Sequence, residues 1–129
     1  AWVPPGPPVM PCLMVGNGHR ALDWYGRAFG GREVNRHDME DGRLGHAMPA
    51  LANGGAIYIA DEFPDLIETA DLAPDSLGGT TVTVALAVDD VDAWLARARA
   101  EGAATIREPR DKFYGRNARL RDPLGHVWR

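Results

Sequence analysis

The chain contains two similar stretches, at residues 15–30 and 88–102, and this near-repeat limits the fold more than any other feature. Each stretch has the pattern of an apolar strand end, followed by an amphipathic helix that stops at glycine. Self-similarity of this kind indicates a duplicated supersecondary unit. A half of this size cannot bury both of its faces alone, so we expect the two halves to share one core.

Local signals divide each half into elements. The expected helix starts are Asn17 or Gly18 and then Asp89 or Asp90, and the expected stops are Gly30 and Gly102. Hairpin signals at 41–42 and 53–55 divide the residues after the first helix into three strands, at 32–38, 43–51 and 56–60. A turn at 122–125 precedes the last strand. Both halves therefore follow the order β-α-β-β-β.

Composition and length predict one domain with four parts. These are a proline-rich arm at 1–8, a first module at 9–61, an acidic linker at 62–79 and a second module at 80–129. The arm is either a mobile tail or a segment that packs on a partner subunit. The net charge of −4 and the lack of a long basic run argue against a nucleic-acid partner.

Other features of the composition concern the compartment. No stretch approaches the roughly 20 apolar residues of a membrane span, and the start has no signal-peptide pattern. Cys12 is the only cysteine, which fits a reducing compartment. The sequence therefore predicts a soluble, cytoplasmic protein with no membrane partner.

Five segments in order carry a resemblance to a known family. They are Asp-Trp-Tyr-Gly-Arg-Ala-Phe-Gly-Gly at 23–31, Ser-Leu-Gly-Gly-Thr at 76–80, Val-Asp-Asp-Val-Asp-Ala-Trp at 88–94, Phe-Tyr-Gly at 113–115 and Arg-Asp-Pro-Leu-Gly-His-Val-Trp at 121–128. The chain resembles the vicinal oxygen chelate superfamily (glyoxalase I, extradiol dioxygenases, bleomycin-resistance proteins), and within it the PhnB-like branch. The resemblance implies an α+β fold in which two β-α-β-β-β modules form a cup-shaped half-barrel with helices outside, and a homodimer.

In the enzymes of that family, His, Glu or Gln side chains from the first and last strand of each module hold a divalent metal. The corresponding positions here are Met10, Tyr58, Thr83 and Arg129. None is a competent ligand for such an ion, and a register shift of one residue does not supply one. The sequence thus implies no metal and no other cofactor. Histidines remaining for a relocated site are His37, His46 and His126.

Strand alternation predicts the lining of the cup, because residues two apart share a face. The expected concave set is Met10, Cys12, Met14, Ala56, Tyr58, Ala60, Thr81, Thr83 and Ala85, and the set expected under the helices is Leu13, Val15, Ile57, Ile59, Val82, Val84 and Leu86. Trp94 and Trp128 are expected in the core. A concave face of thioether, thiol and phenol groups suits a flat aromatic ligand. Alternatively, these side chains only fill the interface between the sheets.

Aromatic side chains near the expected rim, Phe113, Tyr114 and Trp2, are suited to stack on a planar ring. The predicted ligand-binding residues are therefore Met10, Cys12, Met14, Tyr58, Thr81, Thr83, Phe113, Tyr114, Arg119 and Trp2. The acidic linker favours a neutral or cationic ligand, whereas Arg119, Arg121 and Arg129 are suited to hold a carboxylate or phenolate.

The leading hypothesis is a metal-independent binding protein without catalytic residues. By resemblance to the bleomycin-resistance proteins, it would sequester a planar aromatic, antibiotic-like molecule in a hydrophobic groove at a dimer interface. The alternative is a metal-dependent lyase, isomerase or oxygenase of the glyoxalase and dioxygenase type with a relocated site. For acid–base catalysis without a metal, the expected cup offers only Tyr58, Cys12 and the threonines. Cys12 is expected to be a small buried side chain and not a nucleophile. A third possibility is a PhnB-like protein with no small-molecule role.

Overall fold

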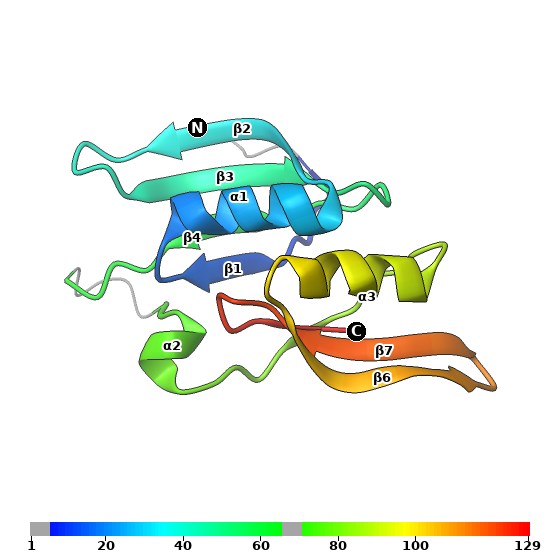
Figure 1. Cartoon of the computed structure of the whole chain (residues 1–129). Helices are drawn as coiled ribbons and strands as arrows, with labels where there is room; N and C mark the ends of the chain where they lie inside the picture. Colours follow the sequence, from blue (N-terminus) through cyan, green and yellow to red (C-terminus); the bar gives the residue numbers. More distant parts are fainter. Residues whose placement is uncertain (1–5, 66–70) are drawn as a thin grey trace.

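A computed structural model of the chain describes residues 6–65 and 71–129, so the predicted site residue Trp2 lies outside the described residues. Two consecutive units follow the same order of strand, helix and three strands (Figure 1). The first comprises β1 (Cys12–Val15), α1 (Gly18–Phe29), β2 (Arg32–Asp38), β3 (Leu44–Ala50) and β4 (Tyr58–Asp61). After the short helix α2 (Pro74–Leu77), the second comprises β5 (Thr83–Val84), α3 (Val91–Ala100), β6 (Ala104–Lys112), β7 (Gly115–Arg121) and β8 (Val127–Trp128).

Each unit forms its own four-stranded sheet, in the orders β1-β4-β3-β2 and β5-β8-β7-β6. In both sheets the first and last strands of the unit are parallel neighbours. Helices α1 and α3 lie side by side over the same side of the two sheets (Figure 1). We call the opposite side of each sheet its inner face. The expected α+β architecture of two β-α-β-β-β modules with helices outside is confirmed.

The helix ends lie where the sequence signals place them. Asn17 caps α1 by accepting the amide of Arg20 at 3.1 Å, and Asp90 caps α3 in the same way. Gly30 ends α1 in the left-handed region, with φ of 65°, and a Cβ there would lie 2.7 Å from the Cβ of Ala52. Glycine is therefore required at this position for both backbone and packing reasons.

One aromatic cluster joins the two modules. Phe29, at the end of α1, is 1% exposed, and its ring centroid lies 4.8 Å from that of Trp128 and 5.2 Å from that of Trp24. Trp94 of α3 lies 5.9 Å from the same ring. The core thus contains side chains from both halves, as the small size of each half required.

A buried carboxylate also connects the modules. Asp122 is 3% exposed and accepts hydrogen bonds from the Tyr25 hydroxyl, from Trp128 Nε1 at 2.8 Å and from the amides of Leu124 and His126. Burial, and then the negative charge of Asp122, raise the pKa of Tyr25 well above its ordinary value. The tyrosine is therefore a permanent hydrogen-bond donor at neutral pH and ties α1 to the second module.

Strand parity is confirmed in the first module, where Leu13 and Ile59 are buried on the helix side. It is wrong at Val82, which is 64% exposed, because β5 is only two residues long and begins after it. Trp128 is buried as expected, but Trp94 is only half-buried at the edge of a cavity.

None of the helices in the described part of the chain is long and apolar enough to cross a membrane.

Candidate functional site

The inner face of the first sheet carries the sulfur and phenol side chains that the sequence predicted for it. Cys12 of β1 lies beside Tyr58 of β4 in the sheet register, and Met14 lies beside Ala60. The ring of His46, from β3, meets that of Tyr58 edge-on, with centroids 4.9 Å apart. This face therefore presents polarizable groups and two planar rings, and none of these side chains carries a full charge as Lys, Arg, Asp or Glu would.

The end of the proline-rich arm lies against the same face. A Cβ placed on Gly6 would lie 3.3 Å from the Tyr58 hydroxyl oxygen and 3.4 Å from Met10 Sδ. Met10 itself is half-buried. Gly6, in the described part of the arm, therefore contacts its own module, whereas the sequence suggested a mobile tail or a contact with a partner subunit.

A groove of about 260 Å³ lies between β1 and the segment that runs from α2 into β5. Cys12 and Met14 line it, together with Val82, Val84 and His126. The side chain of His126 spans the two modules, because its Nε2 lies 2.8 Å from the carbonyl oxygen of Met14. The predicted residues Thr81 and Thr83 do not line this groove: Thr81 is exposed and Thr83 is half-buried in β5.

Cys12 is exposed, not the small buried side chain that was expected. Its pKa is raised, first because the groove partly buries the thiol and then by the negative charge of Asp71. A raised pKa keeps the thiol protonated at neutral pH and makes it a poor nucleophile.

The remaining predicted residues lie on the second sheet. Phe113 and Tyr114 form the tip of the β6–β7 hairpin, which projects away from the first module (Figure 1), and their rings meet edge-on at 5.0 Å. Phe113 is fully exposed. Arg119 is half-buried in β7. A single chain therefore brings Met10, Cys12, Met14 and Tyr58 together but keeps the hairpin aromatics apart from them.

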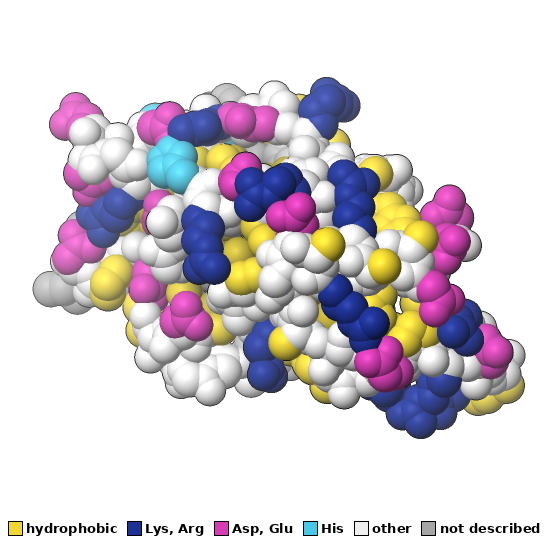
Figure 2. Space-filling view, viewed as in Figure 1, with side chains coloured by type: hydrophobic (Ala, Val, Ile, Leu, Met, Phe, Trp, Pro, Cys, Tyr) yellow, Lys and Arg dark blue, Asp and Glu magenta, His cyan; other side chains and the backbone are white. Residues whose placement is uncertain are grey.

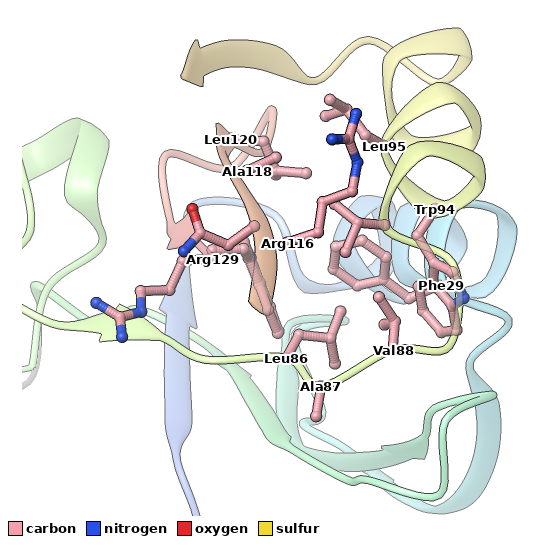
Figure 3. A pocket seen from close by; sticks show the side chains of 13 residues that line it. Phe29, Leu86, Ala87, Val88, Trp94, Leu95, Arg116, Ala118, Leu120 and Arg129 are labelled. Atoms are coloured by element: carbon pink, nitrogen blue, oxygen red, sulfur yellow. The ribbon is translucent and has the colours of Figure 1, made fainter. Parts of the chain in front are cut away.

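A second cavity, of about 200 Å³, lies on the helix side between α3 and the second sheet (Figure 3). Its walls are apolar and include Phe29, Leu86, Trp94 and Leu120. The Arg129 guanidinium points away from it (Figure 3). Sequence reasoning missed this cavity because it assigned Trp94 wholly to the core. The available signal was the small residue Ala118 on the strand opposite the helix.

Comparison with known proteins identifies the family. Residues 8–129 match the model of the Glyoxalase/Bleomycin resistance protein/Dioxygenase superfamily. The chain belongs to this superfamily. Uncharacterized proteins of Mycobacterium tuberculosis and Mycobacterium bovis are 37% identical over 123 residues, which cover 95% of this chain and 72% and 80% of those proteins.

Solved structures that are similar to this chain support the same assignment. TioX from a Micromonospora species is 30% identical, with a TM-score of 0.71 and coverage of 95% of both chains. A PhnB protein from Bacillus cereus is 17% identical, with a TM-score of 0.63 over 95% of this chain and 96% of that one, and shows the shared fold alone. The resemblance seen in the sequence is confirmed.

The metal positions of the superfamily's enzymes do not fit a metal here. Tyr58 is held beside Met10 and the His46 ring, so a phenol and a thioether occupy the first-module positions. Thr83 and Arg129 occupy the second-module positions, and a guanidinium repels a cation. Within residues 6–65 and 71–129, no three His, Cys, Asp or Glu side chains are grouped so that they could hold an ion.

The inner face also includes Asn35, which the sequence analysis did not single out, and His37 and His46, which it considered only for a relocated metal site. The β2–β3 register places Asn35 beside Met48 and His37 beside His46. Burial lowers the pKa of His46, and the neighbouring His37 lowers it further, so its ring is neutral at pH 7. The signal available was the alternation within 43–51, but Gly45 and Pro49 obscured its phase.

Proposed function

We propose that this superfamily member is a metal-independent binding protein that sequesters a small planar aromatic, antibiotic-like molecule. The observation that carries the proposal is the inner face of the first sheet, where Cys12, Met14 and Tyr58 stand beside a neutral histidine ring. Planar ligands gain about 0.5–1.5 kcal/mol per stacked aromatic side chain beyond area burial. Thioethers adapt to such ligands because they are flexible and polarizable.

A second copy of the chain completes the site in this proposal. The groove between β1 and the segment from α2 into β5 holds about 260 Å³, which is below the roughly 300–1,000 Å³ of ordinary ligand pockets. Phe113 and Tyr114 lie at an exposed hairpin tip and do not line the groove of their own chain. In a homodimer they, with Thr81 and Thr83, would form part of the rim. The single cysteine favours the cytoplasm as the site of action.

Tyr58→Ala and Met14→Ala are each expected to weaken binding of a planar aromatic probe such as acridine by about 1–2 kcal/mol, or roughly tenfold. The reason is loss of desolvated contact on the inner face. Titration monitored by tryptophan fluorescence measures the affinity, and thermal melts check that the variants fold. Met39→Ala, in the exposed turn between β2 and β3, is the matched control and should bind as the unaltered chain does.

Two results would contradict the site assignment. One is the absence of a saturable change in fluorescence. The other is unchanged affinity in Tyr58→Ala, since that would move the ligand to the helix-side cavity beside Trp94.

The full chain is expected to sediment as a dimer at tens of micromolar. The physical reason is that, in the described part of one chain, the groove is open and the Phe113 ring is fully exposed. Sedimentation velocity over a concentration series measures the association. A single species with the mass of one chain at all concentrations would remove the partner from the proposal.

A further inference from the structure

Three arginines form a row across the inner face of the second sheet. Arg107 of β6 is the register partner of Arg119 of β7. The β7–β8 register, continued by one residue, places Arg129 opposite Arg119, and the backbone of Arg129 still pairs with that of Val84. Leu120 and Trp128 are buried on the helix side, so the neighbouring Arg119 and Arg129 face the other way.

Within the described residues, the row lacks the acidic partners that five other arginines have, namely Arg27, Arg36, Arg43, Arg99 and Arg116. On the helix side, basic and acidic side chains are interspersed (Figure 2), as in the pair of Arg116 with Asp92 at 2.8 Å. Within the described residues, no Asp or Glu forms an ion pair with Arg107, Arg119 or Arg129. Like charges on directly opposed strand positions destabilise a sheet. The row therefore carries an electrostatic cost that a bound anion would remove.

Two buried donors in the row are unused. The Nε atoms of Arg107 and Arg119 are shielded from solvent, and neither has a hydrogen-bond partner among the described residues. The other end of Arg107 is fixed, because its Nη2 donates to Asn117 Oδ1 at 2.8 Å, and Asn117 Nδ2 lies 3.2 Å from the Tyr114 hydroxyl. The hydrogen bond from Asn117, and then the positive charges of Lys112, Arg107 and Arg129, lower the pKa of Tyr114. The positive field thus reaches the hairpin tip.

We propose that Arg107, Arg119 and Arg129 form a carboxylate-binding subsite, so that the ligand of this protein is a planar aromatic acid. The inference rests on the proposed function, because it adds the charge of the ligand to the ring that the first sheet is proposed to hold. A guanidinium offers two parallel N–H donors that match the two oxygens of a carboxylate.

Two carboxylates where β4 meets the acidic linker are held by local hydrogen bonds. Asp61 accepts the amides of Gly18 and Leu44, and Glu62 accepts the amide of Ala73 and the Ser76 hydroxyl. These carboxylates are committed to local structure. The arginine row, in contrast, has no acidic partner among the described residues.

Calorimetric titration of the full chain with 2-naphthoate and with its neutral isostere 2-naphthamide tests the subsite. At fixed ionic strength, naphthoate should bind about tenfold more tightly. Arg119→Gln should abolish this preference and leave naphthamide affinity unchanged, and Arg119→Lys should restore part of it. Arg20→Gln, which removes one exposed positive charge from α1, is the matched control and should keep the full preference.

A melting curve separates recognition from a structural role. Since Arg119 lies between like charges, Arg119→Gln should melt at the same temperature or higher, and a clear fall in Tm would overturn the proposal. Equal binding of naphthoate and naphthamide would overturn the subsite alone, whereas binding of neither would overturn the proposed function as well. If inorganic phosphate binds as tightly as naphthoate and displaces it, the row binds anions without selectivity, and the carboxylate subsite is overturned. A loss of dimer in Arg119→Gln with the preference intact would assign the row to the subunit interface.

Discussion

Phe29→Ala is expected to lower the free energy of unfolding by about 3–5 kcal/mol. The ring is 1% exposed and lies within 6 Å, centroid to centroid, of Trp24, Trp94 and Trp128. Its removal leaves a cavity between α1, α3 and β8 that rigid aromatic neighbours cannot fill by small movements. Urea unfolding followed by circular dichroism measures the loss.

The matched control is Phe113→Ala, which removes the same side chain from a fully exposed position at the hairpin tip. Its effect on stability should stay within about 0.5 kcal/mol. Similar losses for the two variants would show that Phe29 is not in a shared core. A transition that splits into two steps in Phe29→Ala would show that the modules unfold separately.

Asp122→Ala should have an effect of comparable size, about 3–5 kcal/mol, for a different reason. The change leaves the Tyr25 hydroxyl, Trp128 Nε1 and two backbone amides without their acceptor in a buried place. Asp122→Asn keeps one carbonyl oxygen that can accept from the amides of Leu124 and His126, but it turns an N–H donor toward the Tyr25 hydroxyl and Trp128 Nε1. It should therefore recover only part of the stability that Asp122→Ala loses.

Chemical denaturation at pH 7 measures both Asp122 variants. Glu40→Ala, an exposed carboxylate in the turn between β2 and β3, is the control and should stay within about 0.5 kcal/mol of the unaltered chain. A loss below 1 kcal/mol in Asp122→Ala would mean that water replaces the carboxylate and that the connection between modules is weak.

Features set by local chemistry could be predicted from the sequence. Asn17 and Asp90 cap their helices because the cap bond forms within three residues, and Gly30 is needed where the backbone turns left-handed. The two-residue alternation around Leu13 and Ile59 gave the correct buried face in the first module. These signals do not depend on distant partners.

Features set by register and tertiary contact could not be predicted. The basic residues from Arg107 to Arg121 look like a solvated face until the β6–β7 register brings Arg107 beside Arg119. The proximity of His46 and Tyr58 depends on how β3 pairs with β4, and Gly45 and Pro49 within β3 hide the alternation of that strand. Val82 was assigned to the buried face incorrectly, because a short apolar run carries no signal for the residue at which a two-residue strand begins.

The outer strands of the two sheets have a consequence for self-association. β2 and β6 are edge strands, and both are dense in charge, with Arg32, Glu33 and Arg36 in the first and Pro109 among charged residues in the second. Charged and proline-bearing edges are poor templates for another strand. Association of this chain, or growth of amyloid, through β2 or β6 is therefore disfavoured, even in a concentrated solution of the folded protein.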